Sequence, residues 1–123
     1  MTFVLSESAI RRTVEGPMTM RDQMRHLVEL GRSLPHVSIQ VLPFTARSYV
    51  AASFGFTILR FGGDASSDVV YTENFTTGDY LDRPETVKAY SRLWDDLRAA
   101  ALGPAESSLL ISQAADEFEK SEP

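Results

Sequence analysis

The sequence predicts an α+β fold, because strand-like and helix-like patterns occupy different parts of the chain. Strand-like patterns occupy four short stretches, at residues 3–7, 37–44, 54–61 and 68–73, and apolar and polar residues alternate over Val37–Val41. Helical periodicity appears once between the first two stretches and again over the last third of the chain. The predicted order is β-α-β-β-β, a small mixed β-sheet packed by one crossover helix and two C-terminal helices.

The first predicted strand, Phe3–Glu7, begins almost at the first residue. This position suggests either the remainder of a longer protein or a naturally short one. Ser8–Arg12 is predicted to be a turn or a short helix with Ile10 pointing inward. A helix is expected over Thr19–Leu34, where apolar residues recur at helical spacing, and Pro35 ends it.

The strand–helix–strand order over residues 3–44 predicts a right-handed crossover, so the first two strands should be parallel. The third strand, at residues 54–61, is apolar on both faces and is therefore expected in the centre of its sheet. The strand at residues 68–73 is spaced for an antiparallel hairpin with it. Residues 74–81 are predicted to be a loop.

The longest predicted helix is Asp82–Leu102, with Asp82 and Glu85 spaced as a capping box. Gly103-Pro104 ends it and starts the last helix. The acidic segment 116–123 is expected to fray. Residues 1–123 are predicted to form a single domain, since this length suits one hydrophobic core.

Composition excludes several functional classes. The net charge is −5 and the sequence pI is about 4.9, whereas nucleic-acid-binding domains are normally basic, so no direct nucleic-acid partner is expected. The chain has no cysteine, which removes disulfides and thiolate metal sites. No apolar run approaches 18 residues and no signal peptide is recognisable, so we expect no membrane association and a cytoplasmic location.

No catalytic motif is present in the sequence. The two histidines, His26 and His36, are expected on the surface and do not have metal-ligand spacing. Gly62-Gly63 precedes a strand rather than a helix, so it does not form a phosphate-binding loop. We therefore predict no metal, no cofactor and no assignable catalytic residue.

A ligand pocket is expected, if there is one, between the sheet and the Asp82–Leu102 helix, open toward residues 45–53. Glu7 and Glu73, at the ends of two strands, belong either to a structural ion-pair network or to the polar mouth of this pocket. The alternative interpretation of the whole set is ordinary core and rim residues. The candidate ligand-binding residues are Arg47, Tyr49, Phe56, Tyr71, Glu73, Tyr80 and Trp94.

Several short motifs occur in an order that resembles a known family. They are E-x-A-I-R-R, M-x-x-Q, V-L-P-F, F-T-I-L-x-F, V-V-Y-x-E and A-L-x-P-x-E-S, at residues 7–12, 20–24, 41–44, 56–61, 69–73 and 101–107. The chain resembles the C-terminal domain of unknown function in actinobacterial helix-turn-helix regulators of the XRE type, abundant in Streptomyces and its relatives. The resemblance covers nearly the whole chain.

The resemblance implies an effector-sensing or partner-binding module attached to a repressor or an activator. Some members are described as antitoxin-like and paired with a small partner protein. This chain departs from the family in two ways. It lacks the N-terminal helix-turn-helix, and after V-L-P-F it has Ala46-Arg47-Ser48-Tyr49 where the family has A-G-x-H.

Two functions stay open at this point. The first is a non-enzymatic regulatory domain that binds a small molecule or a small partner protein. The alternative is a stand-alone isomerase or cyclase of natural-product biosynthesis, which requires a shaped apolar cavity rather than a nucleophile motif. A homodimer is also expected, because Leu109, Leu110 and Phe118 form an apolar stripe on the last helix.

Overall fold

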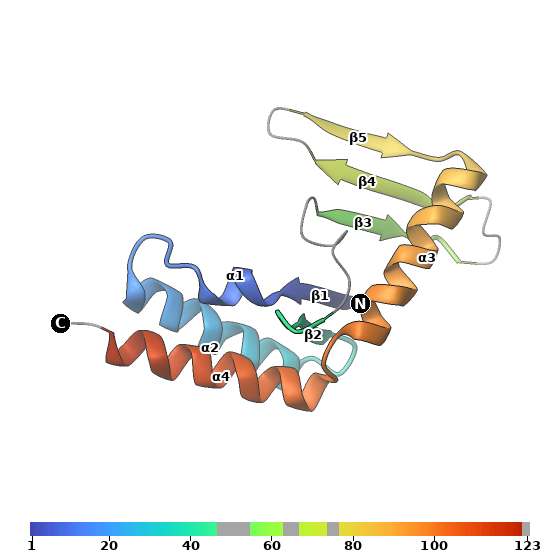
Figure 1. The fold of residues 1–123 in the computed structure, drawn as a ribbon. Helices are drawn as coiled ribbons and strands as arrows, with labels where there is room; N and C mark the ends of the chain where they lie inside the picture. The colour runs from blue at the N-terminus through green and yellow to red at the C-terminus, as the bar shows by residue number, and fades with distance from the viewer. Residues whose placement is uncertain (47–54, 63–66, 74–76, 122–123) are drawn as a thin grey trace. The chain divides into compact units, whose positions relative to one another are not determined.

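The computed structural model describes residues 1–46, 55–62, 67–73 and 77–121, and it confirms the α+β class (Figure 1). The chain forms two compact units. Unit 1 comprises Met1–Ala46 and Ala100–Pro123, and unit 2 comprises Arg47–Ala99. Each unit has its own small sheet, so the predicted single mixed sheet is wrong.

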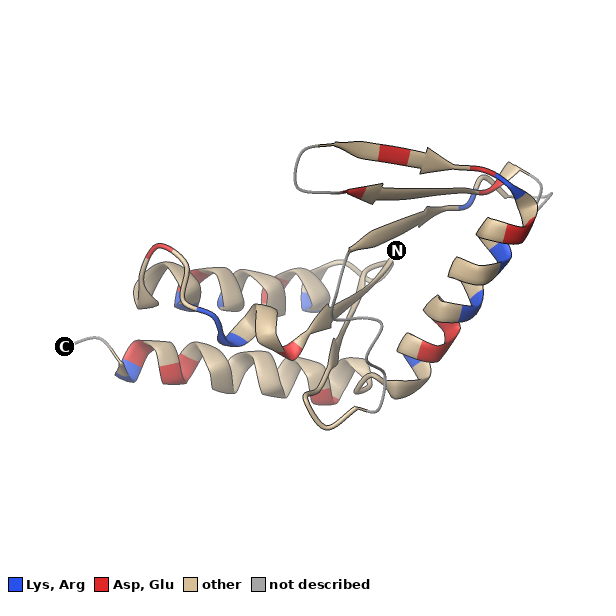
Figure 2. Cartoon of the chain, turned by 45° about the horizontal axis from the view of Figure 1, so that its top comes forward, with Lys and Arg blue, Asp and Glu red and all other residues tan. Residues whose placement is uncertain are grey.

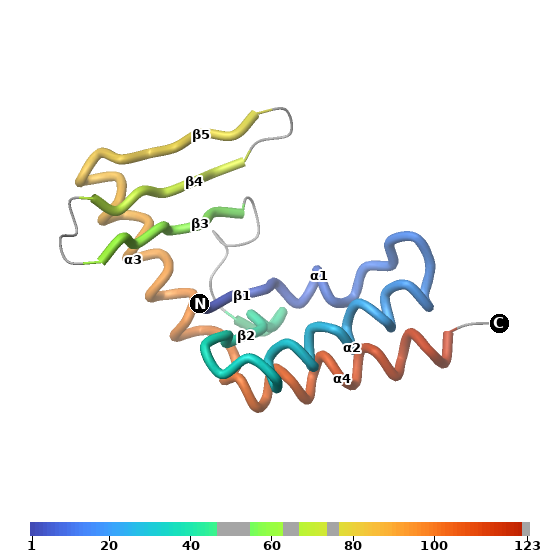
Figure 3. The backbone as a smooth tube through the Cα atoms, turned by 180° about the vertical axis from the view of Figure 1, so that it is seen from behind, coloured from blue at the N-terminus to red at the C-terminus, as the bar shows by residue number. Residues whose placement is uncertain are grey.

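Unit 1 contains two strands and three helices: β1 Thr2–Ser6, α1 Glu7–Arg11, α2 Pro17–Ser33, β2 Ser38–Leu42 and α4 Pro104–Lys120. Strands β1 and β2 pair in parallel, with Phe3 opposite Ile39, which confirms the predicted crossover. Helices α2 and α4 lie side by side along most of their length (Figures 1 and 3). The two-stranded sheet and this helix pair enclose the core of unit 1.

Helix α2 begins two residues earlier than predicted, at Pro17 rather than Thr19. Proline is favoured in the first turn of a helix, because the amide hydrogen it lacks would have no partner there. Gly16 precedes it with φ 105°, a conformation that glycine adopts without strain. The Gly-Pro pair that looks like a break in the sequence is therefore the start of the helix.

The core of unit 1 joins both strands and all three of its helices. Ile10 has no exposed surface, which confirms that the short helix α1 points this residue inward. Met20 and Met24 of α2 are also buried, as their helical spacing predicts. The buried cluster consists of Ile10, Met20, Met24, Ile39, Val41, Ile111, Ala114, Ala115 and Phe118.

Helix α4 continues through the acidic segment that was expected to fray from Asp116. It stays helical to Lys120, because Phe118 is buried and neighbouring acidic side chains pair with arginines of α1 and α2. Figure 2 marks the acidic positions near the end of α4 in red. Arg11 lies 2.6 Å from Glu117, and Arg25 lies 2.7 Å from Glu119. Each such exposed pair contributes only about 0.2–1 kcal/mol, so burial of Phe118 is the stronger anchor.

The apolar stripe that suggested a homodimer is largely covered within unit 1. Phe118 is buried, and Leu110 packs against the core cluster. Leu109 is 61% exposed. A single exposed leucine is ordinary for a protein surface, and the expectation of a homodimer stays a prediction.

Unit 2 contains an antiparallel sheet of three strands, β3 Phe56–Leu59, β4 Val69–Glu73 and β5 Gly78–Leu81, followed by α3 Pro84–Ala100. The predicted hairpin between the third and fourth strands is confirmed, with Phe56 opposite Thr72. Helix α3 starts at Pro84 rather than at Asp82.

Two predictions for unit 2 are wrong. The segment predicted as a loop contains β5, which is short and starts with Gly78-Asp79, residues typical of turns. The order β3-β4-β5 makes β4 the central strand of the described residues, so β3 is not central. One face of β3 packs on α3 through Phe56. Leu59, on the other face, is 37% exposed, so the second apolar face of this strand does not indicate a central position.

Candidate functional site

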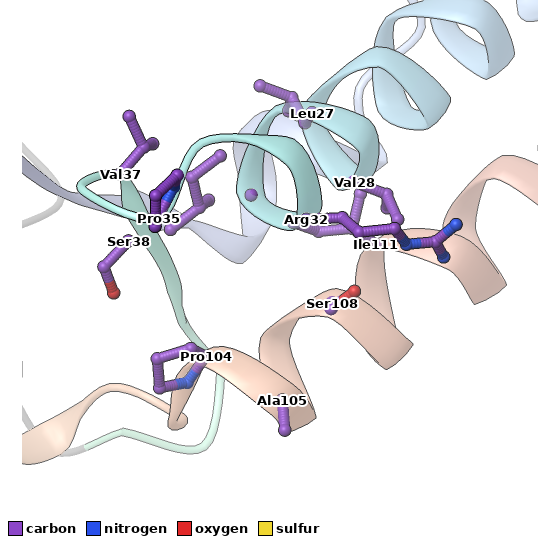
Figure 4. Close-up of a pocket in the computed structure, with 12 residues that line it drawn as sticks. Leu27, Val28, Arg32, Pro35, Val37, Ser38, Pro104, Ala105, Ser108 and Ile111 are labelled. Atoms are coloured by element: carbon purple, nitrogen blue, oxygen red, sulfur yellow. The ribbon is translucent and has the colours of Figure 1, made fainter.

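A groove of about 510 Å³ opens in unit 1 where α2, β2 and α4 diverge (Figure 4). The second half of α2 forms one wall, the first half of α4 forms the other, and β2 with the segment before it closes one end. Its volume lies within the range of about 300–1,000 Å³ that is common for small-molecule sites. The lining residues are Leu27, Val28, Gly31, Arg32, Pro35, Val37, Ser38, Ile39, Pro104, Ala105, Ser108 and Ile111.

Small residues on the facing helices create this space. A Cβ atom added at Gly31 of α2 would meet nothing within 4 Å. On the other wall, α4 presents Ala105 and Ser108, whose side chains are also short (Figure 4). Glycine in the middle of a helix costs roughly 0.5–1 kcal/mol relative to alanine, so a side chain introduced at Gly31 would enter open space without loss of helix propensity.

The lining is apolar with a few polar groups. Leucine, valine and isoleucine side chains form most of it, and Ser38 and Ser108 contribute hydroxyl groups. Among the described residues that line the groove, Arg32 is the only charged one. Its guanidinium lies 4.0 Å from the Glu29 carboxylate, and its side chain is 75% exposed. An apolar cavity with a small number of polar groups is typical of a site that binds small organic molecules.

A hydrogen-bonded junction beneath the groove holds β2 against the start of α4. The backbone N–H of Val41 donates to Ser107 Oγ at 2.8 Å, and Ser107 Oγ donates to the Leu102 carbonyl at 3.2 Å. The Leu102 N–H in turn donates to the Val41 carbonyl at 2.9 Å, and Gln40 Nε2 donates to the Leu102 carbonyl at 3.0 Å. Because these groups are tied together, β2 is held in a fixed position against the start of α4 at this end of the groove.

The carboxylate of Glu7 has a structural role at the end of the strand pair. Its Oε1 accepts a hydrogen bond from the Phe44 N–H at 2.9 Å, and its Oε2 accepts one from Arg11 Nε at 3.3 Å. These bonds fix the chain as it leaves β2. Of the two interpretations of Glu7, the geometry supports a structural ion-pair network rather than the polar mouth of a pocket.

Two of the predicted ligand-binding residues, Phe56 and Trp94, bear on the pocket expected beside α3. Arg47 and Tyr49 lie outside the described residues. The Phe56 ring packs edge-on against Tyr90 of α3, with ring centroids 5.1 Å apart. Trp94, also on α3, is half-buried. The expected contact between this sheet face and the helix therefore exists, formed by packed aromatic side chains.

The other three, Tyr71, Glu73 and Tyr80, lie on the opposite face of the sheet from Phe56. Phe56 pairs with Thr72, and neighbouring residues of a strand point to opposite faces, so Tyr71 points away from α3. The Tyr71 and Tyr80 rings lie 4.9 Å apart, and Tyr71 Oη donates a hydrogen bond to Glu73 Oε1 at 2.9 Å. The structure thus places the strand residues Phe56, Tyr71, Glu73 and Tyr80 on two opposite faces of the sheet, and these two faces cannot line one pocket together.

The hydrogen bond that Tyr71 donates to Glu73 raises the pKa of Tyr71 above its usual value of 10.0. The carboxylate stabilises the protonated phenol by accepting this hydrogen bond, and its negative charge repels the phenolate. The stability that this bond contributes is therefore present at neutral pH and is lost as the pH rises through the raised pKa. We expect Glu73→Gln to lower the pKa of Tyr71 toward the usual value. Carbon-13 NMR titration of the tyrosine Cζ signals measures it, and an unchanged pKa would contradict the assigned cause.

A smaller hollow of about 250 Å³ lies within unit 2, beside the first turns of α3. Its one buried charged group, Asp68, lies 3.8 Å from Arg60 and is 6% exposed. The remaining lining residues are Asp82, Pro84, Val87, Lys88 and Ser91. Asp68, the buried charge of this hollow, is paired with Arg60, so the pair resembles a structural ion pair more than a ligand site.

Metal ligands do not gather anywhere in the described residues: no group of three His, Cys, Asp or Glu side chains is placed to hold an ion. His26 and His36 are exposed, as predicted. Among the described helices, none is long and apolar enough to cross a membrane.

Sequence reasoning missed the groove entirely. Its signal is Gly31, an isolated glycine inside the amphipathic pattern of α2, together with Ala105 and Ser108 in α4. The glycine alone does not reveal a cavity, because the helix that faces it begins about 70 residues later in the chain.

The fold and the groove together define a small α+β module with a mainly apolar groove and no recognisable catalytic cluster in its described part. A family model described as Domain of unknown function (DUF5753) matches residues 1–113, so the chain belongs to this family. No curated protein and no solved structure matched the chain.

Proposed function

We propose that the chain is a regulatory module that binds a small molecule in the groove between α2, β2 and α4. The observation that carries the proposal is the groove itself, a mainly apolar cavity of about 510 Å³ with one cation and two hydroxyl groups. The resemblance to actinobacterial XRE-type regulators, stated above, adds the context of transcription regulation in the cytoplasm. In that context the ligand is an effector.

The arrangement of the walls supports a regulatory role. A molecule in the groove touches α2, β2 and α4 at once, so it stabilises the conformation in which these elements are packed together. A ligand shifts a conformational equilibrium only by its differential affinity for the two states. Because the ligand binds between the two longest elements of unit 1, it favours the state in which they are fixed.

The groove favours binding over catalysis. An isomerase or cyclase needs groups that accept and donate protons near neutral pH, such as histidine or a carboxylate. The described residues that line the groove include neither, and arginine stays protonated. The biosynthetic alternative therefore has less support than the regulatory proposal.

Filling the groove tests the proposal. A thermal-shift screen of small organic compounds should find molecules that raise the melting temperature of the wild-type chain by several degrees at about 100 times their Kd. Gly31→Leu and Ser108→Leu place side chains in the groove from its two walls. Each is expected to weaken binding of these compounds at least tenfold while the chain stays folded.

Gln23→Leu is the matched control, because Gln23 is exposed on α2 and does not line the groove. It should leave the thermal shifts unchanged. The proposal fails if the compounds shift the Gly31→Leu and Ser108→Leu proteins as much as the wild type, or if a broad screen of the folded chain finds no compound that binds.

A further inference from the structure

We propose that the ligand of this groove is an elongated apolar molecule that ends in a carboxylate, and that Arg32 pairs with this anion. The inference rests on the proposed function, because it names the chemical class that the same groove would take. Three features of the groove carry it: the sign of its one charge, the position of the competing acids and the apolar character of its walls.

The charge of the groove is opposite to that of the chain. The net charge of the protein is −5, yet the one charged residue in the described part of the groove lining is the cation Arg32. An arginine presents a planar fork of N–H donors that matches a carboxylate with two parallel hydrogen bonds. Arg32 would repel a positively charged ligand, because the described lining contains no acid that could offset the charge of the arginine.

Arg32 is available for such a ligand. Its nearest acid, Glu29, lies one helical turn away at 4.0 Å, beyond hydrogen-bond distance, and both side chains are largely exposed. Exposed pairs of this kind are weak. Arg32 lines both the groove and a separate hollow of about 220 Å³. Glu29 and Asp116 line that hollow, whereas the described lining of the groove contains no acid. A carboxylate in the groove therefore meets no acidic residue among the described residues that line it.

The remaining walls select an apolar body. Leu27, Val28 and Val37 surround the space, and the buried side chains of Ile39 and Ile111 form its floor. Burying an apolar chain against such walls is favourable in proportion to the area removed from water. The hydroxyl groups of Ser38 and Ser108 can form hydrogen bonds with a further polar group of the ligand. A polyanion such as a nucleotide needs several cations or backbone donors, so a single arginine does not match it.

Three probes of equal chain length separate charge from apolar contact: octanoate, 1-octanol and octylamine. Their affinities for the full chain are measured by isothermal titration calorimetry at neutral pH and low salt. We expect octanoate to bind about tenfold more tightly than 1-octanol, which corresponds to one charge-assisted hydrogen-bonded pair, and octylamine to bind more weakly than either. About 1 M salt should reduce the preference for octanoate, because it shortens the screening length to about 3 Å.

Substitution of the arginine isolates its role. Arg32→Gln should remove the preference for octanoate over 1-octanol while leaving the affinity for 1-octanol within about twofold, and Arg32→Lys should keep part of the preference. Arg12→Gln is the control, because Arg12 is exposed in unit 1 and does not line the groove. It should change neither affinity.

The results distinguish this inference from the proposed function. If octanoate and 1-octanol bind equally, or if Arg32→Gln preserves the preference, the ligand class is wrong, whereas the groove stays a binding site. If octanoate does not bind and the compound screen yields only groove ligands without an anionic group, this inference alone fails. If the screen yields no groove ligand of any charge, the proposed function fails with it.

Discussion

Replacing Ile10 by alanine is expected to lower the free energy of unfolding of unit 1 by about 2–5 kcal/mol. Ile10 has no exposed surface, and it is the buried residue of α1, a helix of five residues. A helix this short is not stable without tertiary contacts, so its position depends on this side chain. Urea denaturation followed by circular dichroism at 222 nm measures the loss.

The conservative substitution Ile10→Val serves as the control, since it removes one methyl group and should cost about 0.5–1.5 kcal/mol. The two variants should therefore differ clearly in their urea midpoints. If Ile10→Ala costs less than about 1 kcal/mol, the side chain is not the anchor that joins α1 to the core. The fluorescence of Trp94 is less suitable for this measurement, because this tryptophan lies in unit 2.

The second large effect is expected at Ser107, where alanine should cost about 1–3 kcal/mol. Ser107 is fully buried, and its Oγ accepts the Val41 N–H at 2.8 Å while donating to the Leu102 carbonyl at 3.2 Å. Removing the hydroxyl leaves a buried backbone donor without this partner, and an unsatisfied donor in a low-dielectric interior is costly. Denaturant unfolding measures the difference.

The adjacent Ser108 is a matched control, because it occupies the same helix turn, faces the groove and belongs to no such junction. Ser108→Ala is expected to change the free energy of unfolding by no more than about 0.5 kcal/mol. Equal losses for the two serines would contradict the role assigned to the Ser107 hydroxyl.

Local patterns predicted most of the individual elements of the fold. Gly103-Pro104 marks the start of α4, and the strand–helix–strand spacing predicted the parallel pair of β1 and β2. These signals depend on residues close together in the sequence. The division into two sheets was not predictable in this way, because it depends on which strands pair, and β5 carries turn-forming residues within its short length.

The candidate site shows why a residue list from sequence falls short. Phe56 and Tyr71 belong to neighbouring strands, and only the pairing register determines that they point to opposite faces. A shift of one residue would have placed them together. The groove depends on a longer-range coincidence, since Gly31, Ala105 and Ser108 come together only when α2 packs against α4.

The central claim is that the groove between α2, β2 and α4 is the binding site. The most direct test is a titration of the nitrogen-15-labelled chain with octanoate, followed by two-dimensional amide NMR. We expect saturable shifts that are largest at Gly31, Ser38, Ala105 and Ser108, and that disappear in the Gly31→Leu protein. Shifts centred in unit 2 around Tyr71 and Tyr80, or the same shifts in Gly31→Leu as in the wild type, would contradict the claim.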